Sequence, residues 1–239
     1  MNRGVKYSME LRLSEELLVL ALDEKRGTIA PFKREYIKYG VAAALLQELI
    51  VLEKLQLDED VVTVIEANPC GDRLLDPALE ILEQSERKKK VQHWVSKIGG
   101  KYGKLKKILL DDLINKDVLR PKDEPGDREG GPGLFRRQRF KIWYDMPLQQ
   151  LRKRLHDILV YGEEPDPGSL RLIGLIHACK LTRRVFTDKE DRERVIQRID
   201  MLTEGDVFKK AIRNIVNSNR ASVVSGIISA AAMILKEAC

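Results

Sequence analysis

The segment 40–57 (GVAAALLQELIVLEKLQL) most constrains the fold, because it is long and has almost no polar face. Its polar residues Gln47, Glu48, Glu53 and Lys54 do not gather on one side of a helical wheel. A helix that is apolar nearly all round is covered by neighbours on every side. The segment therefore predicts a buried central helix, against which other helices pack.

Alternating residues at the end of this segment predict a β-hairpin. Leu55 and Leu57 precede the polar break 58–60, and Val62 and Val64 follow it. Apolar residues at every second position are typical of a strand with one buried face. Helix followed by hairpin is thus the first structural unit.

A second unit of the same kind follows. A helical pattern over 101–116 leads into a strand near Val118, and the segment 135–145 (FRRQRFKIWYD) has the composition of a returning strand. The Gly- and Pro-rich stretch of about 122–134 between them is expected to be a disordered hairpin tip. The interleaved arginine and aromatic residues of the returning strand also suit nucleic-acid binding or self-association.

Other segments predict amphipathic helices. Ser14 is the expected N-cap of a helix that ends before Gly27, and Asp76 with Pro77 predicts another helix start. Trp94 is expected in the core, and 169–186 and 207–236 are expected to be helices. The predicted fold class is mainly α: a tail 1–9, then a single helical domain over 10–239 with a buried central helix, amphipathic helices around it and two short β-hairpins.

Charge points to an anionic partner. Lys and Arg number 43 against 37 Asp and Glu, which gives a net charge of +6. Such a balance favours nucleic acid or an acidic membrane surface. Three cysteines without CxxC spacing predict neither a disulfide framework nor a zinc site and fit a cytoplasmic protein. The apolar stretch 221–235 is too short to span a bilayer, so membrane contact is expected to be peripheral.

Catalytic signals are weak. His93, His156 and His177 fall in three separate expected helices without metal-pair spacing, and Cys179 lies beside His177 in an apolar helix typical of core. The glycines of 130–133 lack the Lys-Ser/Thr ending of a phosphate loop. We therefore expect a protein that is not an enzyme and that has no metal and no cofactor.

The order of short motifs resembles the Golgi phosphoprotein 3 family. The motifs are 11–22 (LRLSEELLVLAL), 39–45 (YGVAAAL), 71–76 (GDRLLD), 91–95 (VQHWV) and 113–119 (LINKDVL). The resemblance extends from about residue 10 to 235. It implies one mostly helical domain, and for eukaryotic members a peripheral adaptor on the cytoplasmic face of the Golgi that binds phosphatidylinositol 4-phosphate.

The resemblance also implies a headgroup site. Family members hold the lipid with a tryptophan before the central helix, an arginine early in that helix and two basic residues three apart on the helix of the second unit. The aligned positions here are Lys33, Ala42, Gly103 and Lys106. Only Lys106 keeps the chemistry of its position, which favours a prokaryotic or divergent member.

A wider rim of cations with one aromatic wedge replaces the lost contacts. The expected lipid-binding residues are Phe32, Lys33, Arg34, Lys38, Lys104, Lys106 and Lys107. Each cation near an acidic membrane contributes about 1 kcal/mol, so several together hold a protein there reversibly.

The predicted function is accordingly a non-enzymatic peripheral membrane protein that binds anionic phospholipid headgroups and presents a protein cargo. The alternative is a winged-helix-like nucleic-acid-binding protein, because a helix followed by a hairpin is also that layout. The apolar faces of the central helix argue against it. Hairpin 134–145 is further expected to mediate self-association through Phe140, Ile142, Trp143 and Tyr144.

Overall fold

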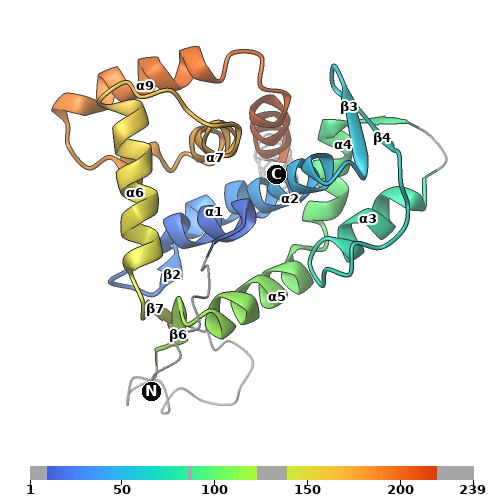
Figure 1. The fold of residues 1–239 in the computed structure, drawn as a ribbon, viewed down its shortest axis with the longest axis horizontal. Coiled ribbons are helices and arrows are strands. Elements are labelled where there is room, and N and C mark those ends of the chain that lie inside the picture. Colours follow the sequence, from blue (N-terminus) through green and yellow to red (C-terminus); the bar gives the residue numbers. More distant parts are fainter. Residues whose placement is uncertain (1–9, 86–87, 123–138, 220–239) are drawn as a thin grey trace, which may run out of the picture.

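Helices dominate the computed structural model of this protein, which describes residues 10–85, 88–122 and 139–219 (Figure 1). The helices are α1 (Leu13–Ala21), the 3-10 helix η1 (Pro31–Lys33), α2 (Arg34–Val51), α3 (Asp76–Glu83), α4 (Val91–Gly99), α5 (Tyr102–Asn115), α6 (Met146–Leu159), α7 (Pro167–Ala178), α8 (Thr182–Val185) and α9 (Glu190–Leu202). Residues 207–219 are also helical. The predicted mainly α fold class is confirmed.

The predicted buried central helix is α2. Most of its residues between Tyr36 and Leu49 are buried, and it contacts α1, α3, α4, α5 and α7. At Gly40 the packing is so close that a Cβ atom would collide with side-chain atoms of Cys179 and Leu17. Helix α2 starts and ends about six residues earlier than the predicted segment 40–57. Its end is earlier because the chain from Leu55 onward pairs as a strand.

Strands occur in three small antiparallel sheets. They are β1 (Leu22–Asp23) with β2 (Thr28–Ile29), β3 (Leu55–Asp58) with β4 (Val61–Val64) and β5 (Lys89–Lys90), and β6 (Leu119–Pro121) with β7 (Phe140–Ile142). Both predicted hairpins are confirmed, with Leu55 opposite Val64 and Leu119 opposite Ile142. The expected tip falls almost wholly outside the described residues.

The start of α1 differs from the prediction. Arg12 is the N-cap, and Ser14 is a buried residue within the helix. The backbone N–H of Ser14 donates to Oε1 of Glu48 at 2.9 Å, which ties α1 to α2. The helix ends at Ala21 because Leu22 and Asp23 pair with β2, a hairpin that sequence patterns did not predict.

Asp76 is the first residue of α3 instead of its N-cap. Its carboxylate accepts from the backbone N–H groups of Cys70 and Asp72 in the preceding turn. Asp72 in turn accepts from the N–H groups of Leu74 and Leu75. The turn residues therefore stabilise one another before the helix starts.

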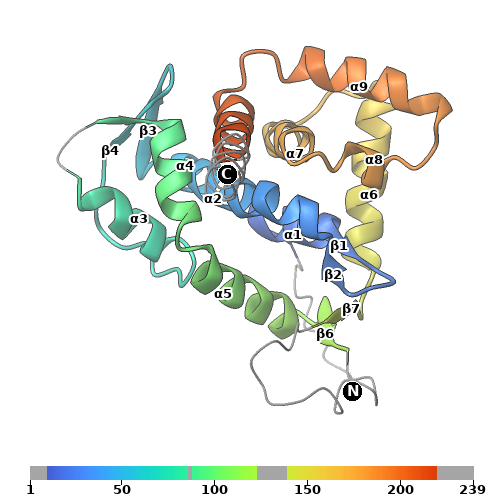
Figure 2. The ribbon, with the colours of Figure 1, turned by 180° about the vertical axis from the view of Figure 1, so that it is seen from behind.

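Helices α6 and α7 pack on one side of the α1–α2 pair, and α9 packs on α6 and α7. Figures 1 and 2 show α6, α7 and α9 together, away from α3 and α5. The predicted helix 169–186 is broken into α7 and α8, with Lys180 at φ +55° between them. The described part of the predicted helix 207–236 ends at 219. Trp94 is buried, as predicted. Over the three described ranges, every helix is too short or too polar to cross a bilayer.

Candidate anion-binding site

The β1–β2 and β6–β7 hairpins meet near the C-terminal end of α5 (Figure 1). The N–H of Phe140 donates to the carbonyl of Gly27 at 2.9 Å. Gly27 has φ +65°, and a Cβ atom there would collide with the backbone of Phe140. Only glycine combines this left-handed conformation with so close an approach at low cost. This contact makes the two hairpins one wall.

A cavity of about 310 Å³ lies between this wall and α5, and we call it the α5 cavity. Its lining consists of Leu18, Leu22, Gly27, Thr28, Ile29, Arg34, Tyr102, Lys106, Leu110, Leu119 and Phe140. Among the described residues, Arg34 from α2 and Lys106 from α5 are the charged members of this lining, and none of its members is a carboxylate. Arg34 Nε donates to the carbonyl of Ile29 at 3.3 Å, which fixes the guanidinium at the cavity.

The described lining of this cavity carries positive charge without a carboxylate to compensate it. Burial lowers the pKa of the Lys106 ammonium, and the nearby Arg34 lowers it further. Burial also raises the pKa of the Tyr102 hydroxyl, which stays neutral. An anion placed between Arg34 and Lys106 would stabilise both charged forms.

Lys33 lines a different cavity, although it precedes Arg34 in the chain. This space of about 710 Å³, which we call the hairpin hollow, lies across the β1–β2 hairpin. It is lined by Asp23, Glu24, Lys25, Lys33, Arg152, Arg183, Arg184, Val185 and Thr187. The single hollow expected to contain both Lys33 and Lys106 is therefore two cavities that share the hairpin as a wall.

The other expected lipid-binding residues line neither cavity. Phe32 is 68% exposed, with the Lys33 ammonium 5.8 Å from its ring centroid. Lys38 pairs with Glu35 at 3.8 Å. Lys104 and Lys107 are exposed on α5. Phe32, Lys104 and Lys107 are thus placed for contact with a large surface instead of a small ligand.

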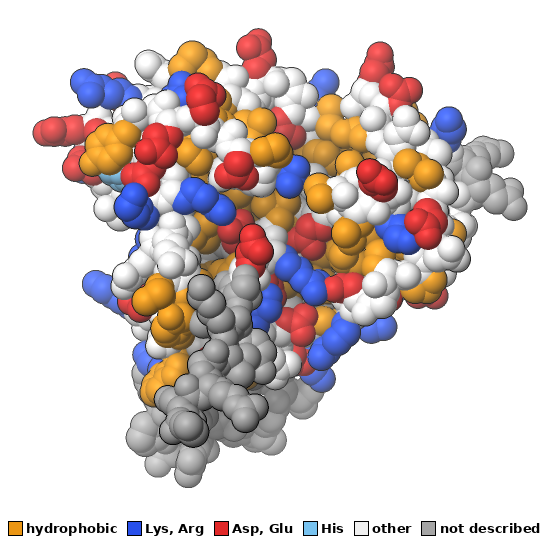
Figure 3. All heavy atoms as spheres, in the orientation of Figure 1, with side chains coloured by type: hydrophobic (Ala, Val, Ile, Leu, Met, Phe, Trp, Pro, Cys, Tyr) orange, Lys and Arg blue, Asp and Glu red, His pale blue; other side chains and the backbone are white. Residues whose placement is uncertain are grey.

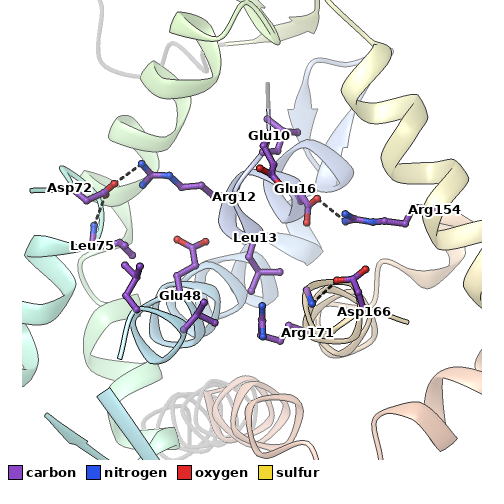
Figure 4. A pocket seen from close by; sticks show the side chains of 14 residues that line it. Glu10, Arg12, Leu13, Glu16, Glu48, Asp72, Leu75, Arg154, Asp166 and Arg171 are labelled. Atoms are coloured by element: carbon purple, nitrogen blue, oxygen red, sulfur yellow. Dashed lines mark hydrogen bonds and ion pairs between the residues drawn. The ribbon is translucent and has the colours of Figure 1, made fainter. Parts of the chain in front are cut away.

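A third cavity, of about 490 Å³, lies between α1, α2, α6 and α7, and we call it the α1–α7 cavity (Figure 4). Its lining includes five carboxylates and three arginines, so it is the acidic counterpart of the first two cavities. Arg12 pairs with Asp72 at 2.5 Å and Arg154 with Glu16 at 2.7 Å. Burial raises the pKa of Glu48, and it raises that of Glu16 to about 7.

Charges of both signs also mix on the face seen in Figure 3, where basic and acidic side chains lie side by side. This face therefore presents no uniform basic surface. Acidic and basic side chains are sorted between the individual cavities instead: carboxylates predominate in the α1–α7 cavity and cations in the other two.

The residues expected to mediate self-association differ in exposure. Phe140 is buried at 3% exposure and Ile142 packs partly against the core. Trp143 and Tyr144 are 51% and 36% exposed. The Trp143 ring stacks with Arg120, whose Cζ lies 3.7 Å from the ring centroid. Only the last two side chains are available for a partner.

Two other classes of site find little support. Among the described residues, no group of His, Cys, Asp and Glu side chains has the arrangement of a metal site. Helix α2 is covered on nearly every side, which leaves it without the exposed face that a recognition helix needs in a DNA groove.

Sequence reasoning missed four basic residues of the hairpin hollow: Lys25, Arg152, Arg183 and Arg184. The adjacent arginines at 183–184 are visible in the sequence, but the pattern over 169–186 predicts one continuous helix there. The short break at Lys180 is what turns them toward the β1–β2 hairpin, because it gives α8 its own direction.

The fold and these cavities define a mainly helical protein built on a buried central helix, with basic cavities beside short hairpins. The match of the Golgi phosphoprotein 3 (GPP34) family model over residues 13–218 agrees with this description. The chain belongs to the Golgi phosphoprotein 3 family, and the resemblance of the motifs is thereby confirmed.

Relatives within the family include two fungal proteins. Both are named vacuolar protein sorting-associated protein 74, from Schizosaccharomyces pombe and Eremothecium gossypii, and each is 28% identical over 131 residues. The match covers 46% of this chain and 38% and 39% of the two relatives. It thus spans well under half of either relative.

Proposed function

We propose that this protein is a peripheral membrane protein that binds anionic phospholipid headgroups in the α5 cavity. The observation that carries the proposal is the presence of Arg34 and Lys106 in one cavity whose described lining residues include no carboxylate. Membership of the Golgi phosphoprotein 3 family supports the same function. The resemblance of the motifs aligns Lys106 with a position where family members carry a basic headgroup ligand.

The geometry of the cavity suits a phosphate group. A guanidinium donates two parallel hydrogen bonds to phosphate oxygens, whereas an ammonium acts as a compact point charge. Arg34 is anchored to Ile29, and Lys106 approaches from the facing helix. A headgroup phosphate between them would be held from two sides.

Residues outside the cavity would strengthen contact with the membrane. Phe32 is exposed directly before the start of α2 and is able to insert between headgroups. Lys104 and Lys107 present two further cations on α5. Each cation near an acidic bilayer contributes about 1 kcal/mol, which gives reversible binding.

The wider role follows from the family. We infer an adaptor at the cytoplasmic face of a membrane, the Golgi in a eukaryotic cell, which presents a protein cargo through another face. Self-association through the hairpin of β6 and β7 would multiply the weak contacts with lipid. Trp143 and Tyr144 are the exposed side chains that such an assembly would use.

Flotation with liposomes tests the lipid-binding function. The wild-type protein should float with phosphatidylserine-containing vesicles at low salt and remain unbound with phosphatidylcholine alone. Lys106→Gln should weaken binding about fivefold, the effect of one cation. Lys210→Gln, an exposed lysine in the helical stretch 207–219, is the matched control and should bind as the wild type does.

Two results would count against this function. The first is absence of the wild-type protein from acidic vesicles at low salt. The second is equal binding by Lys106→Gln and the wild type. A gel shift with DNA and RNA, run in parallel, would reveal the nucleic-acid-binding alternative as binding that weakens steeply with salt.

A further inference from the structure

The hairpin hollow collects basic side chains from four separate elements. Figure 2 shows α6, α8 and the β1–β2 hairpin on one side of the molecule, and residues of all three line the hollow together with Lys33 of η1. Its described lining residues include five basic side chains and two acidic ones. The basic side chains come from positions as far apart as Lys25 and Arg184, so the site exists only in the folded chain.

Arg184 is the fixed part of the hollow. Its Nε donates to the carbonyl of Leu20 at 3.1 Å, and Nη2 donates to the carbonyl of Leu22. Its Nη1 lies 3.5 Å from Oδ2 of Asp23. These contacts join α8 to the end of α1 and hold one guanidinium in place.

The two acidic side chains are already engaged. Asp23 accepts from the backbone N–H groups of Lys25 and Arg26 and contacts Arg184. Glu24 pairs with Arg152 at 2.5 Å. Neither carboxylate is left to neutralise the remaining cations of the hollow.

Three cations therefore remain for a ligand. Among the described residues, none of the side chains of Lys25, Lys33 and Arg183 has a carboxylate within ion-pair distance. Lys33 is partly buried, and burial followed by the positive charge of Arg184 lowers the pKa of its ammonium. An anion in the hollow would remove this destabilisation of the charged form.

We propose that the hairpin hollow is a second anion-binding site, which takes a phosphate monoester through Lys33 and Arg183, with Arg184 as a fixed positive charge behind them. A monoester carries up to two negative charges and three acceptor oxygens, which suit an arginine fork and an ammonium together. The hollow has the size of a site for a small polar molecule. It is separate from the α5 cavity and does not depend on lipid binding there.

The same phosphate monoester can come from a lipid or from a soluble molecule. Two probes separate these sources: vesicles that contain phosphatidic acid, and soluble glycerol 3-phosphate. Both carry a phosphate monoester on glycerol, and the two acyl chains of phosphatidic acid hold that group at a membrane surface. Titration calorimetry measures the soluble probe and co-sedimentation measures the vesicles.

The double variant Lys33→Gln/Arg183→Gln should lose at least fivefold in affinity for one or both probes. Lys106→Gln, which changes the α5 cavity, should lose less affinity for glycerol 3-phosphate than the double variant does, because Lys106 lies outside the hairpin hollow. Lys210→Gln/Arg194→Gln removes one lysine and one arginine from exposed positions outside the hollow and is the matched control. Lys33→Arg keeps the charge and should bind more tightly than the double variant does, which ties the loss of affinity to the loss of positive charge.

A loss confined to vesicles would assign a lipid ligand, and a loss with both probes would assign a phosphate ester in general. The proposal is overturned when the wild type binds neither probe, or when the double variant and its matched control lose affinity equally. Binding of glycerol 3-phosphate without binding to phosphatidylserine vesicles would reject the proposed lipid-binding function and leave this site standing.

Discussion

Replacing Glu16 by glutamine should change how the stability of this protein depends on pH. The Glu16 carboxylate lies in the α1–α7 cavity, 2.7 Å from Nη2 of Arg154 (Figure 4). Burial raises its pKa from 4.5 to about 7. Arg154 opposes this shift, and the negative charges of Asp166 and Glu10 add to it.

The sign of the effect follows from proton binding. The folded protein binds the Glu16 proton more tightly than the unfolded chain does. This contribution to stability is therefore fully present below about pH 4.5 and is lost as the pH rises through about 7. With these two pKa values, the free energy of unfolding falls by about 2.5 kcal/mol between about pH 5 and pH 8.

Urea unfolding at about pH 5 and pH 8 measures this difference. Glu16→Gln should lose less stability over the interval than the wild type, by up to about 2.5 kcal/mol. Glu48 has a raised pKa as well, but it is present in both proteins and cancels from the comparison. Glu193→Gln, which changes an exposed carboxyl on α9, should follow the wild type. Parallel stability changes in the wild type and Glu16→Gln would refute the reasoning.

Three further substitutions, each measured by urea unfolding, test the packing of α2 and the N-cap of α7. Gly40→Val should lower the free energy of unfolding by about 1–3 kcal/mol, because the added atoms overlap Cys179 and Leu17; an unchanged stability would contradict the close approach of α1, α2 and α7. Leu45→Ala, at a fully buried position of α2, should lower the free energy of unfolding by about 2–5 kcal/mol. A loss under about 1 kcal/mol would mean that Leu45 is not part of the core. Asp166→Ala should lower the free energy of unfolding by about 1 kcal/mol, because the Asp166 carboxylate caps α7 by accepting from the N–H groups of Gly168 and Ser169. An unchanged stability would argue against the cap.

Much of the architecture could be read from local patterns. The apolar run of α2 predicts burial on all sides, and burial is what the structure shows from Tyr36 to Leu49. The alternation around 58–60 and the repeat near Val118 predict the hairpins of β3–β4 and β6–β7. These features follow from periodicity, which depends only on neighbours in the chain.

Local reasoning failed where a contact from a distant segment decides the structure. Strands β1 and β2 have two residues each and no alternation, and their hairpin packs on β7 through Gly27 and Phe140. Ser14 has the chemistry of an N-cap, yet its N–H donates to Glu48 on α2 and the residue lies within the helix. Each of these errors has a tertiary partner as its physical cause.

The amino-acid sequence by itself determined the helical class, the central helix, the two helix-and-hairpin units and the family. It also determined that cations occur in both segments of the expected site, 32–38 and 104–107. Tertiary structure alone decided how those cations are grouped. Lys33 and Arg34 are adjacent in the chain, but successive residues at a helix start point in different directions, so they line different cavities. Arg183 and Arg184 reach Lys33 only because α8 packs beside the β1–β2 hairpin, and no pattern within one segment encodes that approach.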